Sequence, residues 1–136
     1  MKTKSILSVS LILIIIFGIS SYNQPYKRVE RFVERNSELL EDKITNNEPI
    51  PSDLTGNCYN TWNYEHEMSE FILFTKGNIY YGCYYSKDDV PLPFQNAQGI
   101  GLNKIDDNRW GWHSIGDNRG ITRKIKDGWY YFEASF

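Results

Sequence analysis

The stretch MSEFILFTKGNIYYGCYYS, residues 68–86, decides the fold of this chain. Its two strand-like runs, Met68 to Thr75 and Ile79 to Ser86, are rich in aromatic and branched residues and flank the tripeptide KGN. Gly77 and Asn78 tolerate the positive φ angles that a tight turn requires. The stretch therefore predicts an antiparallel β-hairpin, and the rest of the chain is assigned outward from it.

A second group of strands follows this hairpin. Turn residues separate four more strand-like runs, which are Gly99 to Ile105, Arg109 to Ile115, Ile121 to Lys126 and Trp129 to Phe136. Between the two groups lies the segment from Lys87 to Gln98, whose Pro91 and Pro93 lack the amide donor of a strand ladder. The sequence therefore predicts an antiparallel sheet of about six strands in two hairpin groups.

A helix is predicted ahead of the sheet, from Pro25 to about Glu48. Its apolar residues recur at spacings of three and four, so one stripe can pack while the charged residues face solvent. Pro25 suits the first turn of a helix, and Pro49 follows its end. The predicted fold class is α+β, with one N-terminal amphipathic helix followed by the antiparallel sheet.

Aromatic residues are concentrated in the strand region. They make up 15% of the chain, and 17 of the 21 lie between Tyr59 and Phe136. Strand alternation places rings on both faces of the sheet, and one helix covers only one face. Either the sheet curls toward a barrel with a second buried layer, or some rings face water as a ligand-accepting surface. We assign most rings to the core, because a domain of about 116 residues needs large side chains to fill its interior.

The chain opens with a hydrophobic leader, residues 1–22. Lys2 and Lys4 precede an uncharged apolar run, which is the order found in signal peptides and N-terminal anchors. If the leader is not cleaved, residues 5–22 anchor the chain in the membrane. If a signal peptidase cleaves the leader after Ser20, the chain is secreted. Residues 23–136 then form a single extracytoplasmic α+β domain.

Charge and motifs exclude several classes of function. Without the leader lysines the chain carries 13 basic and 17 acidic residues, whereas nucleic-acid binding rests on an excess of basic side chains. His66 begins the string HExxE and not the zinc-binding HExxH, and no GxSxG, GxGxxG or phosphate-loop string occurs. We therefore expect no nucleic-acid partner, metal, cofactor or catalytic residue.

The two cysteines, Cys58 and Cys83, are 25 positions apart in the extracytoplasmic part of the chain. That compartment permits a disulfide, and a bridge would stabilise the domain by about 3 kcal/mol in the chain-entropy model. Cys83 fits equally well as a small core residue. The sequence leaves a bridged and an unbridged pair equally open.

One group of residues is a candidate ligand site. Large rings lie close in sequence to polar residues of a glycine-flanked loop, the combination that a small carbohydrate or peptide site needs. The residues are Trp110, Trp112, Trp129, Asp117, Arg119 and Arg123. The same polar residues also fit a simple turn with local ion pairs.

Two strings resemble a family of small proteins of Gram-positive, Firmicutes-type bacteria. They are YYGCYYSKDDVPLPFQ, residues 80–95, and DNRGITRKIKDGWYYFEASF, residues 117–136. The resemblance covers most of the chain beyond Ser20. It implies a leader-bearing extracytoplasmic protein with a charged helix and a sheet, and it brings no functional residue with it.

Three functions remain open. The first is a non-enzymatic extracytoplasmic binding module, tethered to the membrane or secreted, with a protein or carbohydrate partner. The second is a small carbohydrate-active or hydrolytic domain, which would use Asp117 or the pair Asp88 and Asp89 with the tryptophans. The third is a structural protein of the cell envelope.

Overall fold

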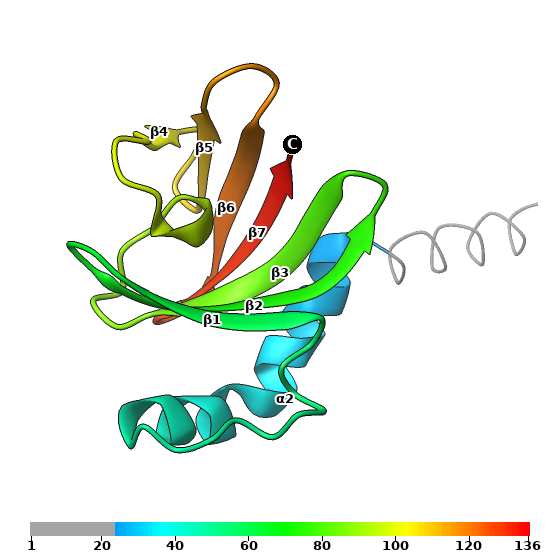
Figure 1. Ribbon diagram of the computed structural model, residues 1–136, viewed down its shortest axis with the longest axis vertical. Helices are drawn as coiled ribbons and strands as arrows, with labels where there is room; N and C mark the ends of the chain where they lie inside the picture. Colours follow the sequence, from blue (N-terminus) through cyan, green and yellow to red (C-terminus); the bar gives the residue numbers. More distant parts are fainter. Residues whose placement is uncertain (1–23) are drawn as a thin grey trace, which may run out of the picture.

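The computed structural model describes residues 24–136, which form one long helix, seven strands and a short 3-10 helix (Figure 1). In chain order they are α2 Pro25–Thr45, β1 Cys58–Asn63, β2 Glu67–Lys76, β3 Ile79–Ser86, η1 Phe94–Asn96, β4 Asn103–Lys104, β5 Arg109–His113, β6 Arg119–Lys126 and β7 Trp129–Ser135. The predicted leader lies outside the described residues. Within residues 24–136, no helix is both long and apolar enough to cross a membrane.

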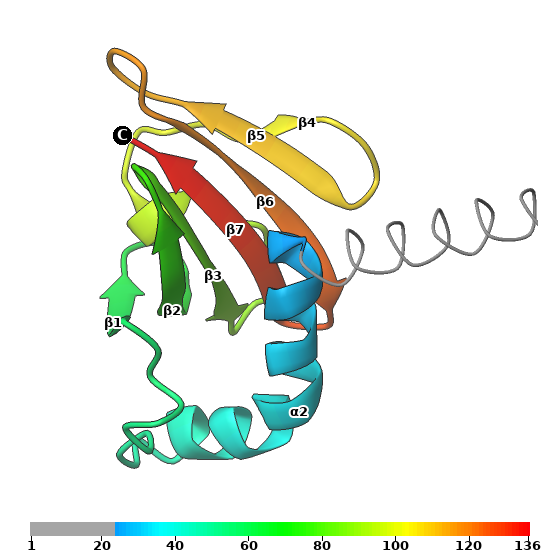
Figure 2. The same ribbon diagram turned by 90° about the vertical axis from the view of Figure 1, so that its right-hand side faces the viewer.

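The seven strands form one antiparallel sheet in the order β1-β2-β3-β7-β6-β5-β4. Two hairpin groups, one on each side of the sheet, are joined by pairing of β3 with β7, which lie far apart in the sequence. The predicted α+β fold is therefore confirmed. The sheet does not close into a barrel, and the edge strands β1 and β4 lie at opposite sides of it (Figures 1 and 2).

The strands differ from the prediction at the two edges. Strand β1, with the sequence CYNTWN, was not among the predicted runs because it lacks an apolar alternation, yet it pairs along its whole length with β2. The predicted strand from Gly99 to Ile105 shrinks to the two residues of β4. Ile100 and Leu102 pack against the core instead of extending that strand.

One face of the sheet is covered by helix α2, as Figure 2 shows. The buried residues between helix and sheet, here called the helix-side core, are Val29, Val33, Leu40, Phe71, Tyr81, Cys83, Trp129 and Tyr131. The three aliphatic residues come from the helix at the predicted spacing, and the strands supply the rings. The helix is thus amphipathic in the predicted way.

The other face is covered by the segment between β3 and β4, residues 87–102, here called the strap. The buried residues on this face form the strap-side core, namely Met68, Ile72, Tyr84, Leu92, Phe94, Trp112, Tyr130, Phe132 and Ala134. Leu92 and Phe94 belong to the strap itself. The rings on the second face are therefore buried by a non-repetitive segment of the chain, without barrel closure.

Buried tyrosine hydroxyls hold the strap on the sheet. Tyr84 accepts a hydrogen bond from the Leu92 amide at 2.8 Å, and its oxygen lies 2.6 Å from the hydroxyl of Thr122. Tyr130 donates to the carbonyl of Asp89 at 2.9 Å. Burial raises the pKa of both phenols, so they remain neutral donors.

Asp89 fixes the start of the strap. Its backbone adopts a left-handed φ of 53°, and its carboxylate accepts from the Gly128 amide at 2.8 Å and from Lys124 at 2.6 Å. These bonds hold the pKa of Asp89 below its usual range, against the opposing effect of desolvation. The turn between β6 and β7 is thereby tied to the strap.

Candidate functional site

The three tryptophans of the predicted site do not share a surface. Trp129 is fully buried in the helix-side core, where its indole N–H donates to Glu41 of α2 at 2.6 Å. Trp112 is buried in the strap-side core, and Trp110 packs against that core. The sheet itself therefore separates Trp129 from the other two rings, and the three cannot stack on one ligand.

Strand register explains this separation. Trp110 lies opposite Thr122, and Thr122 lies opposite Phe132 on β7. Residues directly opposite one another share a face, so this row belongs to the strap side. Trp129 is an odd number of residues from Phe132 and points to the helix side.

The polar residues of the predicted site also separate. Asp117 is exposed in the loop between β5 and β6. The guanidinium of Arg123 lies 3.8 Å from the centre of the Tyr26 ring, so this arginine fastens α2 to the sheet. Arg119 lines a pocket together with one of the predicted tryptophans, Trp112.

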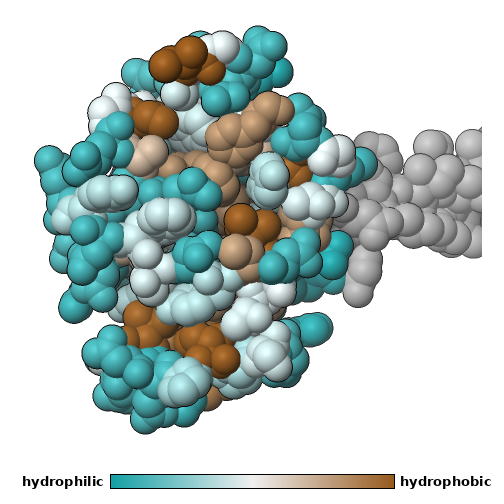
Figure 3. Space-filling model, viewed as in Figure 1, coloured by the Kyte–Doolittle hydropathy of each residue, from teal (hydrophilic) through white to brown (hydrophobic). Residues whose placement is uncertain are grey.

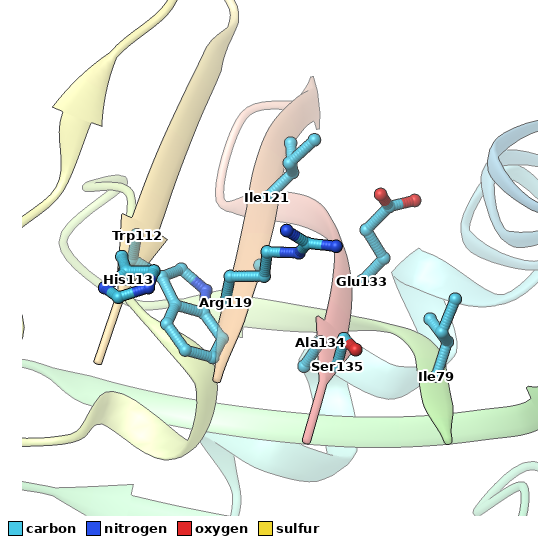
Figure 4. Close-up of a pocket in the computed structure, with 9 residues that line it drawn as sticks. Ile79, Trp112, His113, Arg119, Ile121, Glu133, Ala134 and Ser135 are labelled. Carbon is cyan, nitrogen blue, oxygen red and sulfur yellow. The ribbon is translucent and has the colours of Figure 1, made fainter. Parts of the chain in front are cut away.

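That pocket is an open groove of about 380 Å³ (Figure 4). It lies where β5 and β7 end and where β3 and β6 begin. Its lining residues are Ile79, Trp112, His113, Arg119, Gly120, Ile121, Glu133, Ala134 and Ser135. Ile79 packs against the helix-side core, and register puts Arg119, Ile121, Glu133 and Ser135 on the same face. Trp112 and Ala134 belong to the strap-side core, so the groove lies mainly on the face that carries α2 and reaches the strap side at the end of the strands. The groove occupies a part of that face that the helix leaves uncovered.

The charged side chains of the groove come from adjacent strands. Ile121 lies opposite Glu133, so Arg119, two residues before Ile121, is a diagonal neighbour of Glu133 on the same face. In Figure 4 the Arg119 side chain extends over β6 toward Glu133. Within residues 24–136, Arg119 forms no ion pair.

Tyr131 orients Glu133 from the helix-side core. Its hydroxyl donates to one carboxylate oxygen of Glu133 at 2.8 Å. Burial raises the pKa of Tyr131, and the Glu133 charge beside it adds to the shift, so the phenol keeps its proton. The second oxygen of Glu133 remains available to the groove.

Gly120 allows the floor of the groove to form. A Cβ atom at this position would lie 2.4 Å from the Glu133 carbonyl oxygen and 2.5 Å from the Trp112 ring. The indole of Trp112 therefore lies across Gly120 on the strap side, while backbone lines the groove on the helix side. The glycine permits close packing and is not needed for a turn.

A buried carboxyl group under the strap was missed in the sequence. Glu70 is 1% exposed, and one of its oxygens accepts from the Gln95 amide at 2.9 Å. Its other oxygen and the neighbouring Trp62 indole N–H are also buried, and in the described part of the chain they interact without reaching full hydrogen-bond geometry. Burial raises the pKa of Glu70 to about 7. Its position between Met68 and Ile72 on one strand face was the available signal.

Of the three acidic residues considered for catalysis, Asp88 and Asp89 make structural contacts, and Asp117 is exposed in its loop. Asp88 lies 2.9 Å from the imidazole Nδ1 of His66, and Asp89 clamps the strap to the turn between β6 and β7. Glu133 is the one carboxylate among the residues that line the groove. No three histidine, cysteine or acidic residues between 24 and 136 are placed to hold a metal ion.

The two cysteines are free thiols. Cys58 lies opposite Ile72, and Ile72 lies opposite Gly82, so a whole strand separates Cys58 from the neighbourhood of Cys83. Two strand spacings amount to about 10 Å, whereas a bridge needs Cα atoms within about 7 Å. The cysteines also pack on opposite faces of the sheet. Of the two alternatives left open by the sequence, the structure therefore has the unbridged one.

Comparison of the chain with known protein families, with curated proteins and with solved structures gives no match.

Proposed function

We propose that this protein is a non-enzymatic extracytoplasmic binding module, tethered to the membrane or secreted, which holds a protein partner in the groove. One observation carries the proposal, namely the arrangement of Arg119, which has no ion-pair partner within residues 24–136, beside the aliphatic side chains of Ile79 and Ile121. Arginine next to apolar surface is enriched where proteins bind one another.

The shape and charge of the groove support a protein partner over a sugar. Carbohydrate recognition uses exposed aromatic rings, and the three candidate tryptophans are buried or packed against a core. The groove presents Arg119, Glu133, the His113 imidazole and aliphatic side chains, while Trp112, which also lines it, is only 4% exposed. This lining suits an acidic and a basic side chain of a partner protein. On the face shown in Figure 3, apolar residues form separate patches and not one broad surface.

The arrangement of the carboxylates argues for binding and not for hydrolysis. A glycoside hydrolase needs two carboxyl groups facing one bond, and the groove lining contains only Glu133. His113 shares the groove, but Glu133 accepts a hydrogen bond from Tyr131, and Ser135, the one hydroxyl side chain of the groove lining, is hydrogen-bonded to neither His113 nor Glu133. A structural role in the envelope makes no use of a partnerless arginine.

Charge reversal at Arg119 tests this proposal. The tagged full-length protein is cross-linked in its host and purified as wild type, as Arg119→Glu and as Arg35→Glu, the control on the exposed side of α2. We expect the same partner with wild type and control, and at least tenfold less of it with Arg119→Glu. Equal recovery with all three forms, or no partner with any, would contradict the proposal.

A further inference from the structure

The two edges of the sheet differ in how they are protected against pairing with another chain. An edge strand presents a row of unpaired backbone N–H and C=O groups, and natural sheets shield such rows with short strands, charges, prolines or bulges. Edge strand β4 has only two residues, one of them Lys104, and the acidic pair Asp106 and Asp107 follows it. This edge is therefore shielded by both length and charge.

Edge strand β1 has none of these protections. Its six residues, CYNTWN, include no charge and no proline. Its register with β2 runs without a shift from the Cys58–Ile72 pair to the Asn63–Glu67 pair, so no bulge twists the edge away. The backbone groups on its outer side have no strand partner among residues 24–136.

The cores on both faces of the sheet hold β1 in place. Tyr59 packs on the helix-side core with its ring 4.7 Å from that of Phe71, while Cys58 and Trp62 pack on the strap-side core. Because the strand is already ordered, pairing at its edge costs little further conformational entropy. The side chain of Thr61, in the middle of the strand, is exposed.

We propose that β1 pairs antiparallel with β1 of a second copy of this chain. The twofold axis stands perpendicular to the sheet and passes midway between the two copies of Asn60 or of Thr61, so that the helix-side face of one copy continues into that of the other. An uncharged strand is compatible with itself, because this pairing puts no like charges opposite one another. The result is a continuous sheet of fourteen strands, twice the seven of one copy.

The small size of the contact sets the strength expected for this dimer. One pair of six-residue strands buries less than the roughly 1,600 Å² of a standard stable interface. We therefore expect the full-length protein to be mainly monomeric at about 1 μM and increasingly dimeric toward 1 mM. This interface is separate from the groove, since no residue of β1 lines the groove.

Disulfide trapping tests the pairing. Asn60→Cys and Thr61→Cys are made in the full-length protein carrying Cys58→Ser, and each is exposed to a mild oxidant. Opposite Cβ atoms of an antiparallel pair lie about 5 Å apart, within reach of a disulfide. We expect the position at the axis to form covalent dimers at least tenfold faster than the control Asn103→Cys, made in the same background on edge strand β4.

A charge at the same edge provides the second measurement. Thr61→Lys puts two ammonium groups close together in the paired state, so the concentration-dependent dimer seen by sedimentation should disappear while the circular dichroism spectrum stays unchanged. Trapping at position 60 or 61 no faster than at 103 would overturn the proposal. So would covalent trapping of a different host protein in place of a second copy.

Discussion

The two faces of the sheet are both buried, but the segments that cover them differ in how their backbone hydrogen bonds are satisfied. Helix α2 satisfies its own backbone hydrogen bonds, so it can cover its face largely with aliphatic side chains. The strap has no regular structure beyond η1, and its amides need partners from the sheet. Buried polar groups are therefore expected beneath a strap and are less necessary beneath a helix.

The strap-side core shows this requirement directly. The Leu92 amide is satisfied by the Tyr84 hydroxyl and the Gln95 amide by Glu70, both of which point from strands into the buried layer. The Asn96 side chain donates to the His66 carbonyl at 2.7 Å. Covering this face with the strap therefore requires a buried carboxyl group, that of Glu70, to accept from a strap amide.

The largest loss of stability is expected from removing a ring from the helix-side core. Trp129→Ala removes a fully buried ring and the hydrogen bond to Glu41, and should lower the free energy of unfolding by about 3–5 kcal/mol. Urea denaturation measures this loss. Ile115→Ala, at a residue that is 91% exposed, should change stability by less than about 0.5 kcal/mol. A similar loss in both variants would show that α2 is not held by this core.

The second largest effect is a pH dependence of the free energy of unfolding, which we expect from the strap-side core and not from the helix-side core. Burial raises the pKa of Glu70 to about 7, above its value of 4.5 in the unfolded chain, so the unfolded state loses its proton first as pH rises. The stability contributed by the protonated group is complete below about pH 4.5 and is lost as pH rises to about 7. At the size of this shift, the loss amounts to roughly 3 kcal/mol.

Glu70→Gln isolates this contribution, because the amide stays neutral at every pH. The difference in unfolding free energy between variant and wild type, measured by urea denaturation at pH 5 and pH 8, should grow in favour of the variant at pH 8. Parallel pH profiles for the two proteins would contradict the buried position of this carboxyl group. Glu65→Gln, an exposed neighbour before β2, serves as the control.

The smallest effect concerns the strap alone. Tyr84→Phe leaves the buried Leu92 amide without its acceptor and should cost about 1–3 kcal/mol. Hydrogen exchange should accelerate in strap amides and remain unchanged in α2. Tyr64→Phe, at a half-exposed ring, should leave both segments as in wild type. Equal acceleration in α2 would mean that strap and helix open together.

Local signals in the sequence predicted the regular elements well. The KGN turn, the flanking strands and the three-and-four spacing of the helix depend on neighbours in the chain, and the structure has them close to the predicted bounds. β1 was missed because its burial depends on its neighbours in space. Tyr59, for example, packs on Phe71 of the next strand, which no local pattern reveals.

The residues of the candidate site are separated for a related reason, and only Trp112 and Arg119 among them line the groove. Grouping Trp129 with Trp110 and Trp112 required knowing which faces align across β5, β6 and β7, and that alignment is fixed by strand register. Arg119 was identified from its loop, but its neighbour Glu133 is brought beside it only when β7 pairs with β6. The groove is formed by contacts between segments that are far apart in the chain, and such contacts cannot be predicted from a single sequence.

The clamp at Asp89 has a consequence for the order in which the chain folds. Its partners Lys124, Gly128 and Tyr130 lie 35 to 41 residues further along the chain. Strand β3 likewise needs β7, which follows it by more than 40 residues, as its second pairing partner. Because a chain is synthesised from its N-terminus, the strap stays undocked and its aromatic layer stays exposed until β7 has been made. Folding of this domain therefore waits for β7, and loss of this strand would remove the fold as a whole.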